Sequence, residues 1–214
     1  MINNCQEYWN NKFLKENQDI QSIQPRGDYI FDDINGTKHG FPLQQIPQGG
    51  KILDLGCGIG GFTKQIKLWR PDCEVYGIDF SEVAIQINKD KIPNINFLCE
   101  DVESGLSLPD NFFDVVFMRH VLEYVESPDR FVKEAMRVLK SGGLAYVVTM
   151  FLANRNPEYN NCFTTDSLSM MFFDYSNQMD VFHAIKGQSG NAWNATIFLV
   201  KNKEVYTESI YSYL

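Results

Sequence analysis

The fold is decided by residues 51–63, which read KILDLGCGIGGFT. An apolar run is followed by a glycine-rich turn and then by apolar residues at helical spacing, which predicts a buried strand, a loop and a helix. Gly56, Gly58 and Gly60 can adopt positive φ angles and let the backbone approach a ligand closely. Glycines alone are a weak signal, because Gly56, Gly58 and Gly61 also fit the G-x-G-x-x-G pattern of dinucleotide sites.

The residue that separates these alternatives is Asp54, just ahead of the first glycine. In a dinucleotide site the glycine loop faces a pyrophosphate, and a carboxylate at its mouth would repel that group. Asp54 therefore favours a ligand with a cationic end.

Length and charge limit the classes of protein to consider. A chain of 214 residues predicts one domain with a single substantial core. A formal charge of −8 disfavours a broad electrostatic grip on nucleic acid, which needs clustered Lys and Arg. No apolar run approaches the ~20 residues of a membrane helix, and the first residues do not resemble a signal peptide. Five cysteines without a Cys-x-x-Cys pair predict free thiols and a cytoplasmic location.

The first 50 residues are the hardest to interpret. Residues 4–17 predict a short amphipathic helix with Tyr8, Trp9 and Phe13, either packed on the domain edge or covering a ligand. Residues 17–50 predict an irregular arm with a short helix near 41–46. We therefore expect a substrate-selecting lid at 1–50 and a ligand-binding domain at 51–214.

From residue 51 onward, strands alternate with helices, which predicts right-handed crossovers and a mostly parallel sheet. The expected strands are 51–55, 74–79, 94–98, 112–117 and 144–150, and the expected helices are 62–69, 81–89, 127–140 and 164–173. Residues 179–185 and 192–200 predict an antiparallel terminal hairpin. Parallel sheets bind ligands beyond the carboxyl ends of their strands. Asp54, Asp79 and Asp101 all fall at those ends, so we expect three acids along one edge.

These segments together resemble class I S-adenosylmethionine-dependent methyltransferases, of the methyltransferase type 11-like small-molecule group. The matching motifs are LDLGCGIG at 53–60, GID at 77–79, EDV at 100–102, FDVV at 113–116 with HVLE at 120–123, and RVLKSGG at 137–143. Only the last departs clearly, with Ser141 where the family has proline. The resemblance implies a Rossmann-like three-layer α/β sandwich, with a mostly parallel seven-stranded sheet and an antiparallel C-terminal hairpin.

The resemblance also implies the cofactor S-adenosyl-L-methionine, its product S-adenosyl-L-homocysteine, and a set of binding residues. The methionine end would be held by Asp54 and by the loop residues Gly56, Cys57, Gly58 and Gly60. Asp79 would accept both ribose hydroxyls and Phe80 would lie against the adenine. Asp101 would accept from the adenine amino group, the Val102 N–H would donate to the ring, and backbone at Met118 and Arg119 would close the site.

The expected reaction is in-line transfer of a methyl group to an oxygen or nitrogen atom of a small molecule. A base is needed only for a hydroxyl or a protonated amine, and His120 is the first candidate. The alternative is that His120 caps backbone or packs under the next helix; His39 and His183 suit surface and structural roles. Some similar quinone-pathway enzymes bind a metal through Glu-x-x-Glu-His, but this stretch reads HVLEY at 120–124 and differs at two of the three positions, so we predict no metal. Glu123 and Tyr124 are expected to belong to the helix that follows.

Two other functions stay open at this point. One is an NAD(P)-dependent oxidoreductase built on Gly56, Gly58 and Gly61; the other is a non-catalytic cofactor-binding relative that acts through a protein partner. The segment after the fourth strand lacks the Asn/Asp-Pro-Pro-Tyr/Phe and Pro-Cys motifs of DNA methyltransferases, which makes a nucleic-acid substrate an unfavoured choice.

Overall fold

The computed structural model describes residues 6–16, 46–151, 160–161, 163–175, 179–186 and 193–201. The helices are α1 (Gln6–Glu16), α2 (Gly61–Trp69), α3 (Glu82–Lys91), α4 (Pro128–Val138) and α5 (Thr165–Phe172), with 3₁₀ turns η3 (Val102–Ser104) and η4 (Phe173–Tyr175). The strands are β1 (Lys51–Leu55), β2 (Glu74–Asp79), β3 (Asn96–Cys99), β4 (Phe113–Arg119), β5 (Leu139–Phe151), β6 (Met179–Lys186) and β7 (Trp193–Val200). His39, residues 41–45 of the predicted helix at 41–46 and most of the arm lie outside the described residues.

The strands form one seven-stranded sheet in the order β3-β2-β1-β4-β5-β7-β6. β1 pairs in parallel with β2 and β4, β2 with β3, and β4 with β5. β7 is antiparallel to both β5 and β6. This arrangement confirms the predicted mostly parallel sheet with an antiparallel C-terminal pair.

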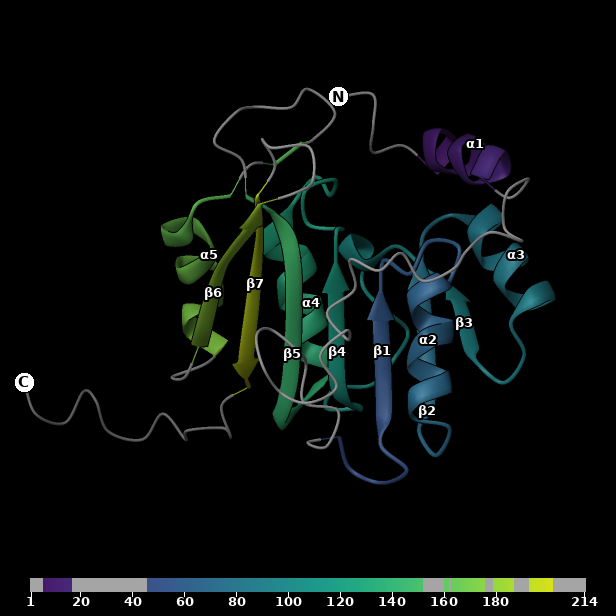
Figure 1. Cartoon of the computed structure of the whole chain (residues 1–214), viewed down its shortest axis with the longest axis horizontal. Coiled ribbons are helices and arrows are strands. Elements are labelled where there is room, and N and C mark those ends of the chain that lie inside the picture. The colour runs from purple at the N-terminus through teal and green to yellow at the C-terminus, as the bar shows by residue number, and fades with distance from the viewer. Residues whose placement is uncertain are drawn as a thin grey trace, which may run out of the picture.

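Helices cover both faces of the sheet because its strands bury alternate residues on opposite sides (Figure 1). In β4, Val116 and Met118 join the core under α4 and α5, whereas Val115 and Phe117 join the core that includes Ile66 of α2. The two cores and the sheet between them make the expected three-layer sandwich.

The carboxyl ends of the parallel strands lie at one edge of the sheet, and α1 lies above that edge (Figure 1). The residues at the ends of β1, β2, β3 and β4 are therefore brought to one edge of the sheet. The most distant pair of predicted site residues, Asp54 and His120, lie 66 positions apart in the sequence. This edge is where the fold places a ligand.

Local capping explains several helix starts. Ser81 accepts a hydrogen bond on Oγ from the Ala84 N–H at 3.2 Å, and α3 follows as predicted. Thr164 and Ser167 form a capping box at the start of α5. The longest helices, α1 and α4, have 11 residues each, and no helix in the described part of the chain has the length and apolar character to cross a membrane.

The predicted end of α4 was wrong. The sequence favoured a helix to residue 140 ended by the two glycines, but α4 ends at Val138 and β5 begins at Leu139. Leu139 pairs with Phe113 of β4 across a register shift. Strand pairing between distant segments therefore overrides the local helix preference of this sequence.

Candidate functional site

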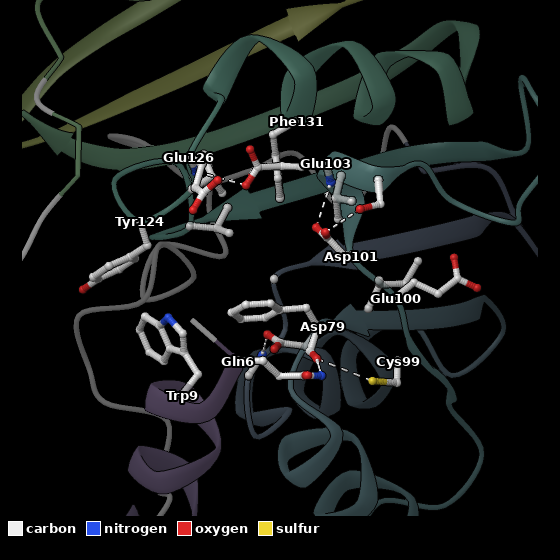
Figure 2. A pocket seen from close by; sticks show the side chains of 18 of the residues that line it. Gln6, Trp9, Asp79, Cys99, Glu100, Asp101, Glu103, Tyr124, Glu126 and Phe131 are labelled. Atoms are coloured by element: carbon white, nitrogen blue, oxygen red, sulfur yellow. Dashed lines mark hydrogen bonds between the residues drawn. The ribbon is translucent and has the colours of Figure 1, made fainter. Parts of the chain in front are cut away.

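A cavity of about 960 Å³ opens at the carboxyl edge of the parallel strands. Its wall comes from α1, the glycine loop, the ends of β2 and β3, the turn after β4 and the start of α4 (Figure 2). The predicted site residues in the wall are Gly56, Gly58, Asp79, Phe80, Asp101, Val102 and His120. The predicted residues Asp54, Cys57, Gly60, Met118 and Arg119 are not part of this wall.

The glycine loop is fixed to the end of β2. The N–H groups of Gly56 and Cys57 both donate to the Ile78 carbonyl, at 2.8 and 2.9 Å. Gly56 has φ +77, and a Cβ there would lie 2.6 Å from Val121 Cγ2. Only glycine satisfies both the left-handed backbone and this close contact, so the loop presents bare backbone to the cavity.

Asp79 ends β2 at the floor of the cavity and is 8% exposed. Its Oδ2 accepts from the Gly58 N–H at 2.8 Å and its Oδ1 from the Ser81 N–H at 2.9 Å. Burial raises the pKa of Asp79, and these backbone hydrogen bonds act in the opposite direction. Each carboxylate oxygen keeps a second acceptor site, so Asp79 can receive hydrogen bonds from a ligand while holding the loop.

Asp101 follows β3 and caps the turn η3. Its Oδ1 accepts from the Glu103 N–H at 3.0 Å and its Oδ2 from the Ser104 hydroxyl at 2.7 Å. Val102 begins η3, where a backbone N–H has no acceptor within the helix. The pair offers an acceptor and a donor side by side at the cavity wall, which suits the edge of a heterocyclic base.

Asp54 lies behind the glycine loop and is 3% exposed. Its Oδ2 accepts from the Thr63 hydroxyl at 2.6 Å. Burial raises the pKa of Asp54 to about 6, while the Thr63 hydrogen bond and the charge of Arg119 lower it. The Arg119 guanidinium in turn lies 3.9 Å from the centre of the Phe62 ring. Asp54 therefore supplies negative charge from behind the loop.

Gly60 and Met118 also lie away from the cavity. Gly60 packs against α3, where a Cβ would lie 2.7 Å from Asn88 Oδ1. Met118 is fully buried in the core under α4. Because its side chain is buried in the core, Met118 can contact a ligand only through its backbone. The family resemblance gives Met118 that role.

His120 directly follows β4 with φ +50, an uncommon backbone angle for a residue other than glycine. Its N–H donates to the Val148 carbonyl at 2.7 Å, and its ring Nδ1 lies 3.2 Å from Glu123 Oε1. The expectation that Glu123 and Tyr124 belong to the next helix was wrong, because they lie in a turn that ends before α4 begins at Pro128. Tyr124 lines the cavity beside His120.

Helix α1 closes one side of the cavity. Trp9 stacks on Phe13 with ring centres 5.5 Å apart and meets Tyr124 edge-on at 4.9 Å. Gln6 Nε2 donates to the Phe80 carbonyl at 2.6 Å. The helix therefore both packs on the domain and lines the cavity, so the two interpretations of residues 4–17 are not exclusive (Figure 2).

The cavity is rich in carboxylates. Its wall contains Asp79, Glu82, Glu100, Asp101, Glu103 and Glu126, and Figure 2 shows the labelled acids around one opening. Arg130 is the single Lys or Arg among the described lining residues. Glu82, Glu103 and Glu126 could not be predicted as wall residues, because they lie outside every recognised motif of the sequence. Such a wall favours a cationic ligand and disfavours a pyrophosphate.

The chain is similar to known methyltransferases. A family model described as a methyltransferase domain matches residues 53–147. The ubiquinone biosynthesis O-methyltransferase of Coxiella burnetii is 34% identical over 128 residues, 58% of this chain and 52% of that protein. The ubiquinone/menaquinone biosynthesis C-methyltransferase of Pseudomonas paraeruginosa is 29% identical over 142 residues, 60% of this chain and 55% of that protein. A solved SAM-dependent methyltransferase from Aquifex aeolicus is 21% identical with a TM-score of 0.56, covering 72% of this chain and 85% of that one.

The sheet order and the site at its carboxyl edge define a Rossmann-like α/β domain of the methyltransferase type. The matched domain model, the curated relatives and the solved structure support the resemblance to class I S-adenosylmethionine-dependent methyltransferases on which the motif predictions rest. The chain spans about half the length of the curated relatives it matches. Because a shared fold does not fix a reaction, its acceptor must be argued from the site.

Proposed function

We propose that this protein transfers the methyl group of S-adenosyl-L-methionine to an oxygen or nitrogen atom of a small-molecule acceptor. The observation that carries the proposal is the charge of the cavity, where acids at the ends of β2 and β3 are joined by carboxylates from three further segments. A sulfonium with an ammonium group matches that charge, and a dinucleotide does not.

The residues present fit this cofactor. The loop at Gly56 and Gly58 gives the close backbone approach that the methionine end requires, with Cys57 and Gly60 keeping the loop in shape and Asp54 behind it. The ribose hydroxyls would be received by Asp79, the adenine would lie along Phe80, and its edge would meet Asp101 and the Val102 N–H; backbone at Met118 and Arg119 would close the floor. When bound, the cofactor supplies a methyl group that its positively charged sulfur has already activated.

The chain's own contribution is to align the acceptor, exclude water and receive a proton. Trp9, Phe13 and Tyr124 form an aromatic wall that would keep water from the reacting atoms. His120 at the cavity wall would accept the proton of a hydroxyl or amine acceptor. We propose His120 as the general base.

We also propose that residues 1–50 act as a substrate-selecting lid on a methyltransferase domain at 51–214. Trp9 and Phe13 in the cavity wall support this division. The acidic wall supports a small-molecule acceptor over a nucleic acid, whose phosphates it would repel. The free thiols of Cys57, Cys73 and Cys99 fit a cytoplasmic location, which we propose on that basis.

The proposal is tested by incubating the full chain with methyl-labelled S-adenosyl-L-methionine and a pooled small-molecule extract. We expect labelled small-molecule products and S-adenosyl-L-homocysteine, and a much slower release of both with the His120→Ala variant. A matched incubation with RNA and DNA should stay unlabelled. A blank small-molecule pool with a tightly bound cofactor would favour the non-catalytic alternative.

A further inference from the structure

Glu123 is a buried carboxylate that the cavity does not use. It is 1% exposed and lies outside the cavity wall. A carboxyl group taken out of water is costly unless hydrogen bonds satisfy it. Both of its oxygens are satisfied: Oε1 lies 3.2 Å from His120 Nδ1, and Oε2 accepts from the Thr149 hydroxyl at 2.9 Å. The carboxylate of Glu123 is therefore held between His120 and the strand beside it.

The contact links the tautomer of His120 to the charge of Glu123. An ionised carboxylate only accepts hydrogen bonds, so with Glu123 ionised Nδ1 is the donor. In a neutral imidazole the other nitrogen, Nε2, is then an acceptor. His120 is 40% exposed and lines the cavity, so the part of the ring that remains open to the cavity carries the basic nitrogen.

The backbone of this turn is held independently of the ring. The His120 N–H donates to the Val148 carbonyl at 2.7 Å, next to Thr149 on β5. The Glu123 carbonyl accepts from the N–H groups of Asn160 and Asn161, at 2.9 and 3.1 Å. With both ends of the turn anchored, an uncommon φ of +50 at His120 is maintained, as is often seen where a side chain is held for chemistry.

We infer that Glu123 is the positioning residue of His120, and that Thr149 holds Glu123 in place. This inference rests on the proposed methyl transfer. For a hydroxyl acceptor, the oxygen lone pair forms the new O–CH₃ bond while the C–S bond breaks and its electron pair stays on sulfur. The hydroxyl proton passes to His120 Nε2, and the resulting imidazolium is paired with the Glu123 carboxylate until it releases the proton to water.

A purely structural role for Glu123, as an anchor of the turn, makes a different prediction. If Glu123 were only an anchor, replacing it would lower the stability of the fold and would not change which nitrogen of His120 carries the proton. Glu134 gives a matched control, since it is a partly buried acid that accepts the Leu106 N–H at 2.6 Å and binds Arg137 away from the cavity.

The first readout needs no substrate. The chain has 3 histidines, so ¹⁵N-histidine NMR of the full-length protein near neutral pH can resolve and assign His120 with a His120→Gln reference. We expect wild-type His120 to be the Nδ1–H tautomer. In Glu123→Gln the tautomers should mix, because an amide can donate as well as accept, and in Glu134→Gln the spectrum should match the wild type. A wild-type Nε2–H tautomer, or an unchanged spectrum in Glu123→Gln, overturns the inference.

The second readout is kinetic. Glu123→Gln should lower turnover by about 100-fold, within the range for a general base, with S-adenosyl-L-homocysteine affinity changed less than about twofold. If that variant does not fold, Thr149→Val removes the hydroxyl at nearly constant volume and should lower turnover by about fivefold, the scale of one hydrogen bond. Unchanged turnover in both variants refutes the positioning role. If the wild type transfers no methyl group, the proposed function fails, while the NMR result still decides the Glu123–His120 pairing.

Discussion

The Asp54→Asn variant tests whether the buried carboxyl group behind the glycine loop has a raised pKa in the folded protein. Asp54 is 3% exposed, and its burial raises the pKa to about 6 from 3.8. The Thr63 hydroxyl donates to Asp54 Oδ2 at 2.6 Å and offsets only part of the cost of burial. The ligand-free protein therefore carries a buried negative charge that a cationic ligand would compensate.

The sign and size of the effect follow from proton linkage. Because the folded-state pKa is higher than the unfolded one, the native state holds a proton between pH 3.8 and about 6 that the unfolded chain releases. The free energy of unfolding therefore falls as pH rises through that window. A difference of about two units between the folded and unfolded pKa corresponds to about 3 kcal/mol of unfolding free energy. This contribution is present at low pH and is lost once the pH is above about 6. The amide side chain in the Asp54→Asn variant does not ionise, so the variant should lack this fall.

The measurement is urea unfolding of ligand-free wild type and Asp54→Asn at pH 4, 5, 6 and 7. The unfolding free energy of the wild type relative to the variant should drop by about 2.4 kcal/mol between pH 4 and pH 7, because part of the total is already lost at pH 4. Contributions from the other titrating groups cancel in that difference. Asp90→Asn, on the exposed face of α3, serves as the control and should not change the slope. A constant difference between wild type and Asp54→Asn at all four pH values would show that folding does not raise the pKa of Asp54.

Three further variants test the glycine loop, the ribose-binding carboxylate and the turn after β4. Gly60→Ala should lower the unfolding free energy by about 2–4 kcal/mol in urea, because φ is +74 and the new Cβ would lie 2.7 Å from Asn88 Oδ1; a loss under about 0.5 kcal/mol would contradict the loop geometry. Asp79→Ala should weaken S-adenosyl-L-homocysteine at least about tenfold in equilibrium dialysis, since it removes charge-assisted acceptors; unchanged affinity would make the ribose assignment wrong. Asn161→Ala removes hydrogen bonds of 3.0 and 2.7 Å to Leu122 and Val125 and should cost about 2 kcal/mol by the same urea assay; an unchanged midpoint would show that the turn is held elsewhere.

Local sequence signals were sufficient for much of the sheet. β2 has the predicted bounds, and Ser81 caps α3 as expected, because both depend on neighbouring residues alone. The start of α4 shows the limit. Ser127 occupies the N-cap position, but its side chain makes no capping hydrogen bond. The backbone N–H of Ser127 donates to the Glu103 carboxylate, 24 positions earlier, and nothing in the local pattern could reveal that contact.

The candidate site was predictable where residues stand at strand ends. Asp79 and Asp101 line the cavity because parallel strands align their carboxyl ends at one edge. Glu123 was expected in the helix that follows, whereas its position is set by a hydrogen bond from Thr149 on β5, which no local pattern reveals. Trp9 could be recognised as an aromatic on a helix, but its meeting with Tyr124 depends on how α1 docks. Contacts set by docking and by strand order are the part that sequence patterns cannot supply.

The choice of cofactor is tested most directly by isothermal calorimetry of the full chain with S-adenosyl-L-homocysteine and, separately, with NADH. An acidic cavity with Asp54 behind its glycine loop predicts binding of one S-adenosyl-L-homocysteine per chain and no heat from NADH. Binding of NADH without binding of S-adenosyl-L-homocysteine would show that the cavity is a dinucleotide site.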